Sequence, residues 1–132
     1  MHGEAPAHIV LEDEQTIAFL DNRPLFPGHT LLLPRTHVDT LPELPDELLV
    51  PLFGNARLLA RAMLPAFGAE GSFVALNNVV SQSVPHLHVH VVPRRRKDGL
   101  RGFFWPRTKY SHEEQEVEAR DKLRAALAEL GR

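Results

Sequence analysis

The chain has 132 residues, of which 43% are hydrophobic and 24% are charged, a composition typical of one globular domain. It contains no cysteine, which excludes disulfide bonds, thiolate metal sites and cysteine nucleophiles. The formal net charge is −2, but seven basic residues and one acidic residue lie between Arg94 and Lys109, so attraction for phosphate is expected to be local.

The first third of the chain predicts three short strands. Residues Ile9–Leu11 and Thr16–Leu20 are aliphatic or β-branched runs separated by an acidic turn, which favours a hairpin. Residues Asp21–Gly28 hold two prolines and a glycine and predict a turn-rich connection. A third strand, Thr30–Leu33, is closed by a proline.

Apolar residues recur at spacings of three and four from about Asp46 to Phe67, which predicts an amphipathic helix. Pro51 lacks a backbone donor and is expected to kink this helix or to move its start. Gly68 is the expected C-terminal stop. The apolar stripe, which includes Met63 and Phe67, is expected to lie in the core.

The last part of the chain predicts a fourth strand at Phe73–Leu76 and a final helix from about His112 to Leu130. Ser111 and Glu114 have the spacing of a capping box for that helix. With the histidine-rich strand described next, the order of elements predicts an α+β fold. We expect about five antiparallel strands, one long central helix and a C-terminal helix, in a single domain of residues 1–132.

The run from Ser81 to Pro93 holds three of the eight histidines at alternate positions. Its valines and its bounding prolines predict one buried strand. Side chains of a strand alternate between faces, so His86, His88 and His90 are expected on one face, about 6.5–7 Å apart. A single strand histidine is usually a core residue, whereas three in alternation indicate chemistry near neutral pH.

Metal binding and nucleophilic catalysis are the two chemistries to compare. Three histidines in a row would span about 13 Å, which suits a single tetrahedral ion poorly, although two of them could bind a metal with His29 or His37. Histidine is also a covalent nucleophile, and phosphorus is an electrophile that tolerates it. Gln82 and Ser83 precede the strand and offer neutral donors for phosphate oxygens. The residues therefore favour phosphoryl or nucleotidyl transfer.

The run Gln82-Ser83-Val84-Pro85-His86-Leu87-His88-Val89-His90 resembles the signature of the histidine triad (HIT) family. The segments Ala18–Asp21, Pro27–His29 and Leu31–Arg35 are also similar to that family, and the resemblance covers about residues 9–97. The family usually has glycine where this chain has Ser81, and the loop from Asn77 to Gln82 is two residues shorter. Residues 98–132 form the basic and aromatic segment and the last helix.

The resemblance implies unequal roles for the site residues. His88 would be the nucleophile that attacks the α-phosphate and forms a nucleotidyl-histidine intermediate, with His86 orienting it and His90 contacting the phosphate. The implied substrate-binding residues are Phe19 (base pocket), Asp21 (ribose), His29 (histidine cluster), Asn77, Gln82 and Ser83. His37 is similar to a zinc ligand of members with N-terminal cysteines, which are missing here, so no metal site is expected.

The resemblance further implies hydrolysis of a dinucleoside polyphosphate such as diadenosine tri- or tetraphosphate, releasing a nucleoside monophosphate. A nucleoside phosphoramidate substrate and a nucleotide-binding or scaffold role without turnover are the alternatives. No resident cofactor is expected, although Mg²⁺ can accompany the substrate phosphates.

The expected partner is therefore a small nucleotide, with neither nucleic acid nor membrane. Family members are typically homodimers, and residues 103–105 (Phe-Phe-Trp) are candidates to reach the partner subunit. No signal peptide or membrane span is visible, which favours the cytoplasm.

Overall fold

The computed structural model describes residues 7–101 and 106–131. The aromatic residues 103–105 lie outside this part of the chain, so their predicted role stays a prediction. The chain divides into two compact units, Met1–Asp98 and Gly99–Arg132. No helix in the described part of the chain is both long and apolar enough to cross a membrane.

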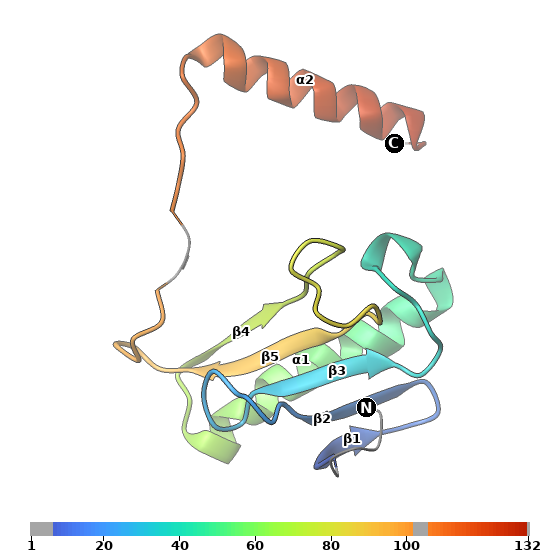
Figure 1. The fold of residues 1–132 in the computed structure, drawn as a ribbon, viewed down its shortest axis with the longest axis vertical. Helices are drawn as coiled ribbons and strands as arrows, with labels where there is room; N and C mark the ends of the chain where they lie inside the picture. The colour runs from blue at the N-terminus through green and yellow to red at the C-terminus, as the bar shows by residue number, and fades with distance from the viewer. Residues whose placement is uncertain (1–6, 102–105, 132) are drawn as a thin grey trace. The chain divides into compact units, whose positions relative to one another are not determined.

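The first unit is built on one five-stranded antiparallel sheet (Figure 1). Its strands in chain order are β1 (Ile9–Glu12), β2 (Thr16–Leu20), β3 (Thr30–Pro34), β4 (Gly71–Ala75) and β5 (Val89–Arg94). The spatial order is β1-β2-β3-β5-β4, so β5 lies between β3 and the edge strand β4. The predicted α+β class with an antiparallel sheet is confirmed.

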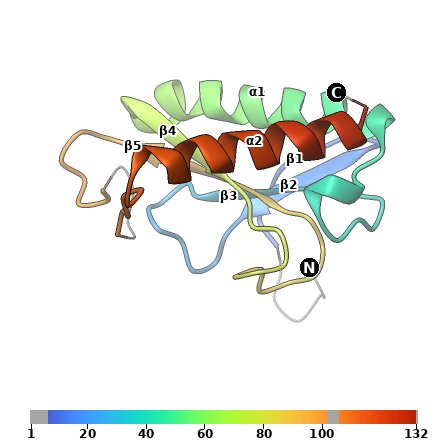
Figure 2. The same cartoon turned by 90° about the horizontal axis from the view of Figure 1, so that it is seen from above.

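The central helix α1 (Leu49–Phe67) lies along one face of the sheet (Figure 2). Two short 3₁₀ turns, η1 (Leu41–Glu43) and η2 (Asp46–Leu48), precede it. Because η2 takes the first predicted residues, Pro51 falls in the first turn of α1, where its missing N–H has no helical partner to lose. Gly68 ends the helix in the left-handed conformation, with φ of 64°.

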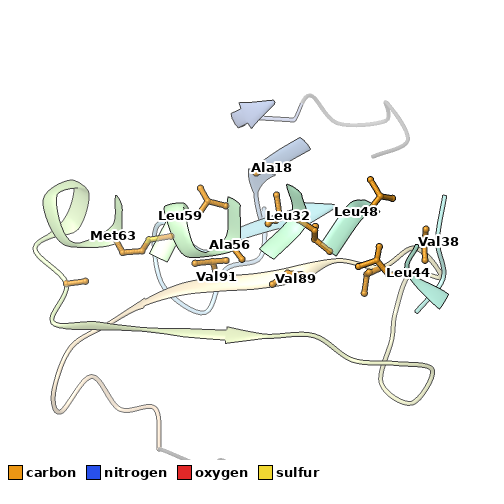
Figure 3. Close-up of a cluster of buried hydrophobic side chains, with 13 residues drawn as sticks. Ala18, Leu32, Val38, Leu44, Leu48, Ala56, Leu59, Met63, Val89 and Val91 are labelled. Atoms are coloured by element: carbon orange, nitrogen blue, oxygen red, sulfur yellow. The ribbon is translucent and has the colours of Figure 1, made fainter. Parts of the chain in front are cut away.

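The core lies between α1 and the sheet (Figure 3). Leu52, Ala56, Leu59 and Met63 form the buried stripe of α1, as the spacing predicts. The strands contribute their alternate residues from the same side, namely Ala18, Leu32, Val89 and Val91. The opposite face of the sheet points away from α1.

The second unit contains helix α2 (Glu113–Glu129). Its N-cap is His112, whose ring Nδ1 accepts the backbone N–H of Gln115 at 3.2 Å. The predicted capping box of Ser111 and Glu114 is wrong, because the Ser111 hydroxyl donates to the side chain of Gln115 instead.

Candidate active site

The register of the strands decides which side chains share the open face of the sheet. Phe19 lies opposite Leu31, and Leu31 lies opposite His90. Paired residues of antiparallel strands point to the same side, so these three side chains face away from α1. Leu32 and Val89, one residue along, pair with each other and enter the core under α1.

The histidine run enters this face as an extended segment that becomes a strand only at Val89. The prediction of one strand containing all three histidines is therefore wrong for His86 and His88. The expected alternation holds, because the three histidines are half-buried while Leu87 and Val89 are fully buried. Pairing with β3 stops because Pro34 has no N–H to offer and its carbonyl accepts the ring Nε2–H of His86, at 2.9 Å.

A pocket of about 240 Å³ opens beside the last two triad histidines. Of the predicted site residues, it brings together Asp21, Ser83, His88 and His90. Asn22, Leu31, Leu33 and Val84 also line it and were missed by sequence reasoning. The signal for the two leucines is their alternation with the core residue Leu32, but it is readable only once the register is known.

The ring of His88 is fixed by a backbone carbonyl. Its Nδ1 lies 2.8 Å from the carbonyl oxygen of His86. A carbonyl can only accept, so Nδ1 carries the proton, and in the neutral ring Nε2 keeps its lone pair. The contact from His86 to the ring of His88 is thus made by its backbone carbonyl, and an orienting role for the His86 ring stays a prediction.

His90 receives a proton donor from the turn that precedes β3, residues 21–29, which we call the Gly28 turn. The backbone N–H of Leu25 donates to Nδ1 of His29 at 3.0 Å, so the proton of the neutral His29 ring sits on Nε2. That Nε2 lies 2.9 Å from Nδ1 of His90. His90 therefore accepts at Nδ1 and presents Nε2–H as a donor.

Both rings of this pair stay neutral near pH 7. Burial lowers the pKa of His29, with Asp21, whose Oδ2 is 3.7 Å from Nε2, partly opposing it. Burial, and then the neighbouring His29 and His88, lower the pKa of His90 to about 4. The chain of donors that sets the tautomers therefore persists at neutral pH.

The loop of residues 77–83, which we call the Gln82 loop, is held by side-chain amides. Gln82 accepts the backbone N–H of Val79 at 2.9 Å and donates to the carbonyl of Asp39 at 2.6 Å. Asn77 donates to the carbonyl of Ser81 at 3.2 Å. These bonds join residues of the loop to one another and to Asp39. Contacts of Gln82 and Asn77 with a substrate therefore stay predictions.

The Gln82 loop is also strained. Val79 has φ of 69° and Ser81 has φ of 63°, a region that costs non-glycine residues about 1–2 kcal/mol each. Asn78 connects the loop to η1, because its side-chain oxygen accepts the backbone N–H of Leu41 at 2.8 Å. Together, the side chains of Asn77, Asn78 and Gln82 make four hydrogen bonds that fix the strained backbone of the loop.

Phe19 and His37, which sequence reasoning considered for the base pocket and for metal binding, do not line the pocket. Phe19 is buried in β2 on the open face, but the pocket lining does not include it among the described residues. His37 packs on the ring of His86, with centroids 5.0 Å apart, and its Nε2 lies 2.7 Å from a carboxylate oxygen of Asp39. It therefore buttresses the first triad histidine from outside.

The basic stretch begins with Arg94, the last residue of β5. Arg94 is four residues beyond His90, which is about 13 Å along a strand. Arg94 pairs with Asp98 at 2.6 Å, and Arg96 pairs with Glu70 at 2.8 Å. These arginines therefore serve the end of the sheet, and their charges are balanced there.

Asp21, His29 and His90 offer ligand atoms within 4.8 Å of one another. A cation bound by all three would have to break the hydrogen bond between the two rings, since His29 uses its other nitrogen for Leu25. These three residues therefore fit a hydrogen-bond chain that fixes the tautomers of His29 and His90 better than they fit a metal site.

Comparison with known proteins gives a consistent result. Residues 2–97 match the family model described as the HIT domain. A crystal structure of a member of the HIT family of proteins from Bacillus subtilis is 34% identical to the chain, with a TM-score of 0.75 over 92% of this chain and 90% of that one.

Two similar proteins have named activities. An adenylylsulfatase from Arabidopsis thaliana is 31% identical over 102 residues, 76% of this chain and 52% of that protein. An asymmetrical bis(5'-nucleosyl)-tetraphosphatase from Schizosaccharomyces pombe is 35% identical over 83 residues, 61% of this chain and 46% of that protein.

Proposed function

The chain belongs to the HIT domain family, and from the geometry of its site we propose that it hydrolyses dinucleoside polyphosphates at the α-phosphate through a covalent nucleotidyl-His88 intermediate. The observation that carries the proposal is the tautomer of His88. Its Nδ1–H is committed to the carbonyl of His86, so the lone pair resides on Nε2 of a ring that lines the pocket. A lone pair held beside a pocket suits a nucleophile.

The proposed reaction has two displacements. In the first, Nε2 of His88 attacks the α-phosphorus, a P–N bond forms, and the bond to the bridging oxygen breaks, so the remaining nucleoside polyphosphate leaves. In the second, water attacks the same phosphorus and loses a proton, and the P–N bond breaks. The nucleoside monophosphate departs, and His88 returns to the neutral ring with its proton on Nδ1.

His90 supplies the donor for this chemistry. Its ring centroid is 5.1 Å from that of His88, and both rings line the pocket. Because its Nδ1 accepts from His29, its Nε2–H is free to donate to a phosphate oxygen as charge develops there. Such a donor typically contributes 10²–10⁴-fold when it also protonates the leaving group.

The rest of the pocket suits a nucleoside. Leu31, Leu33 and Val84 give it apolar walls, and Asp21 adds a carboxylate to its lining. An apolar slot with a few polar groups is the usual setting for a base and a sugar. The family resemblance supports Asp21 as the acceptor for ribose hydroxyls, and Ser83 as a phosphate donor.

A second substrate class is supported by the similar proteins. The same nucleophile would serve a P–N bond or a phosphosulfate, and one similar protein is named as an adenylylsulfatase. The dinucleoside polyphosphate is favoured because another is named as a tetraphosphatase. The leaving group, rather than the attacking atom, is what separates these activities.

The test is a substrate panel. Purified protein is incubated with diadenosine tetraphosphate, adenosine phosphoramidate or adenylyl sulfate, and AMP is measured by chromatography. We expect AMP from diadenosine tetraphosphate at the highest kcat/KM. His88→Ala should abolish it, whereas His8→Ala, which changes an exposed histidine, should not. Equal rates for wild type and His88→Ala would contradict the proposal.

We further propose that the protein acts as a homodimer with the sheet continued across the interface. The edge strand β4 pairs only with β5 among the described strands, and its Val74 is 44% exposed. A strand at the edge of a sheet with an exposed valine suits strand addition. Light scattering after gel filtration should give twice the mass of one chain, and a monomeric mass at micromolar concentration would contradict the dimer.

A further inference from the structure

The Gly28 turn is the element that delivers His29 to the site. The backbone N–H of His29 donates to the carbonyl of Phe26 at 3.0 Å, and the backbone N–H of Asp21 donates to the carbonyl of His29 at 2.9 Å. Gly28 has φ of 101°, which an L-residue rarely adopts. The position of His29 against His90 therefore depends on how this turn is held.

The ring of Phe67 lies against Gly28. A methyl group built on Gly28 would stand 2.5 Å from Cε2 and 2.6 Å from Cζ of that ring. Such distances are far inside ordinary contact, so the ring occupies the space that a side chain at Gly28 would need. Phe67 is 39% exposed and is absent from the core cluster, although its spacing predicted a core residue.

The end of α1 that carries Phe67 is itself fixed. Gly68 closes the helix, with its N–H donating to the carbonyl of Leu64 at 2.8 Å. The guanidinium of Arg95 donates to the carbonyl of Phe67. The backbone N–H of Arg95 in turn donates to Asp98 at 3.0 Å. The basic stretch thus braces the helix end on which the ring stands.

We propose that Phe67 is a positioning residue of the active site, whose ring holds Gly28 and thereby keeps His29 on His90. This inference rests on the proposed function for its effect on turnover, but the contact between the two histidines can be measured without turnover. Arg95 contributes to the same positioning, because its guanidinium donates to the backbone carbonyl of Phe67.

A purely structural role for Phe67 makes a different prediction. If the ring only stabilised the end of α1, its removal would lower stability and leave the titration of the site unchanged. If it positions the Gly28 turn, its removal lets water reach the histidine pair. The groups facing His90 are His29 from the turn, Asp21 from the end of β2 and His88 from the run before β5. With less burial, the pKa of His90 should rise toward its ordinary value.

The experiment compares Phe67→Ala with Leu58→Ala in protein labelled with ¹⁵N-histidine. Leu58 is an exposed apolar residue of α1 that lies nine positions away, on the opposite side of the helix. NMR of the ring nitrogens gives the tautomer and the titration of each histidine, assigned with His29→Ala and His90→Ala. We expect His90 to titrate at higher pH in Phe67→Ala, and as in wild type in Leu58→Ala.

Turnover of diadenosine tetraphosphate provides the second readout. Phe67→Ala should lower kcat/KM on the order of 10-fold to 100-fold at pH 7, as a displaced catalytic group does, and should shift the acid limb of the pH profile upward. Leu58→Ala should stay within about twofold, as surface substitutions usually do. Unchanged titration and an unchanged pH profile in folded Phe67→Ala would overturn the inference.

A coupled pair of substitutions guards against a variant that fails to fold. Gly28→Ala forces a methyl into the ring, whereas in the Phe67→Ala background the methyl has room. The backbone strain at φ of 101° is common to both backgrounds and cancels in the comparison. We expect Gly28→Ala to cost less in the Phe67→Ala background, both in unfolding midpoint and in the shift of the His90 titration. Strict additivity would overturn the contact.

The failure of this inference and the failure of the proposed function are distinguishable. If wild type releases no AMP but Phe67→Ala shifts the His90 titration, the positioning role of Phe67 is supported and the hydrolase proposal is contradicted. If wild type releases AMP and Phe67→Ala changes neither the titration nor kcat/KM, the hydrolase proposal is supported and the positioning role is contradicted.

Discussion

Two loops border the site and are held by different means: the Gly28 turn carries His29, which contacts His90, and the Gln82 loop carries Ser83, which lines the pocket. The Gly28 turn places a glycine at its positive φ and is held by the ring of Phe67. The Gln82 loop places Val79 and Ser81 at positive φ and is held by side-chain amides. The first loop avoids strain by its choice of residue, whereas the second carries strain and offsets it with hydrogen bonds.

This difference indicates where each loop is sensitive to substitution. In the Gly28 turn, loss of His29 should be harmful because the tautomer of His90 depends on it, and a side chain added at Gly28 should be harmful because the ring of Phe67 fills that space. The Gln82 loop should respond to the loss of an amide, and it should gain stability when glycine replaces a strained residue.

The largest effect is expected from breaking the Gly28 turn at its histidine. His29→Ala removes the proton donor to Nδ1 of His90, so His90 can adopt the other tautomer and lose its donor toward phosphate. We expect kcat to fall by roughly 10²-fold, within the range for loss of general acid catalysis. Steady-state kinetics on diadenosine tetraphosphate measure this.

The matched control for that variant is His37→Ala, which removes a histidine outside the pocket. We expect it to retain kcat within about threefold, because the contacts of His37 with the His86 ring and with Asp39 lie outside the pocket. If His29→Ala were no slower than His37→Ala, the proposed relay from Leu25 to His90 would be wrong.

A smaller effect should follow from breaking the Gln82 loop at its amide. Gln82→Leu keeps the approximate size of the side chain but leaves the N–H of Val79 and the carbonyl of Asp39 without this partner. We expect roughly a 10-fold loss of kcat/KM through displacement of Ser83, which lines the pocket.

A comparison of Gln82→Glu separates the two hydrogen bonds. Glutamate retains an oxygen for the N–H of Val79 but cannot donate to the carbonyl of Asp39. Activity of Gln82→Glu below that of Gln82→Leu, combined with an intact fold by circular dichroism, would show that charge near the phosphate matters more than loop closure.

Substitution of serine by glycine should change stability in opposite directions at a strained position and in a strand. Ser81→Gly relieves the strain at φ of 63° and should raise the free energy of unfolding by about 1 kcal/mol. Ser72→Gly, the same chemical change in strand β4, should lower it by about 0.5–1 kcal/mol. Urea denaturation measures both, and a loss of stability in Ser81→Gly would contradict the strain.

A pH dependence of stability is expected from His90, the β5 residue whose ring accepts from His29 of the Gly28 turn. The pKa of His90 is lowered to about 4 in the folded protein from an ordinary value of 6.5. Between these values the unfolded chain binds more protons than the folded protein, so the free energy of unfolding should fall as pH falls from 6.5 to about 4. The contribution is fully present only above pH 6.5.

Denaturation of wild type and His90→Asn across this pH window measures the contribution. The asparagine variant, which has no titrating ring, should lose stability less steeply as the pH falls, while His8→Asn should follow wild type. Asp13 does not interfere, because its pKa falls from 3.8 to about 2, chiefly through the amide of Asn55, and it acts only below this window. Parallel curves for wild type and His90→Asn would contradict the assignment.

The sequence predicted the scaffold of the site better than its fine geometry. The alternation of His86, His88 and His90 identified the face they share, because a strand period of two is a local property. The positive φ of Ser81, where the family usually has glycine, was not predicted and is a finding of the structure.

What sequence reasoning missed depends on contacts between distant segments. The tautomers of His88 and His90 follow from the carbonyl of His86 and the N–H of Leu25, which are backbone groups that no residue pattern identifies. Phe67 fits the helical apolar stripe, yet it packs on a glycine 39 positions earlier in the chain. The basic stretch suggested a polyanion site, whereas Arg94 pairs with Asp98 at the far end of β5.

The most direct test of the central claim is detection of the covalent intermediate on His88. The protein is mixed with diadenosine tetraphosphate, quenched in alkali on the millisecond scale to preserve the P–N bond, digested and analysed by mass spectrometry. The account predicts an adenylyl group on the peptide that contains His88, absent in His88→Ala and accumulating in His90→Ala if that substitution slows the second displacement more than the first. Release of AMP at the wild-type rate by His88→Ala, without any adduct, would contradict it.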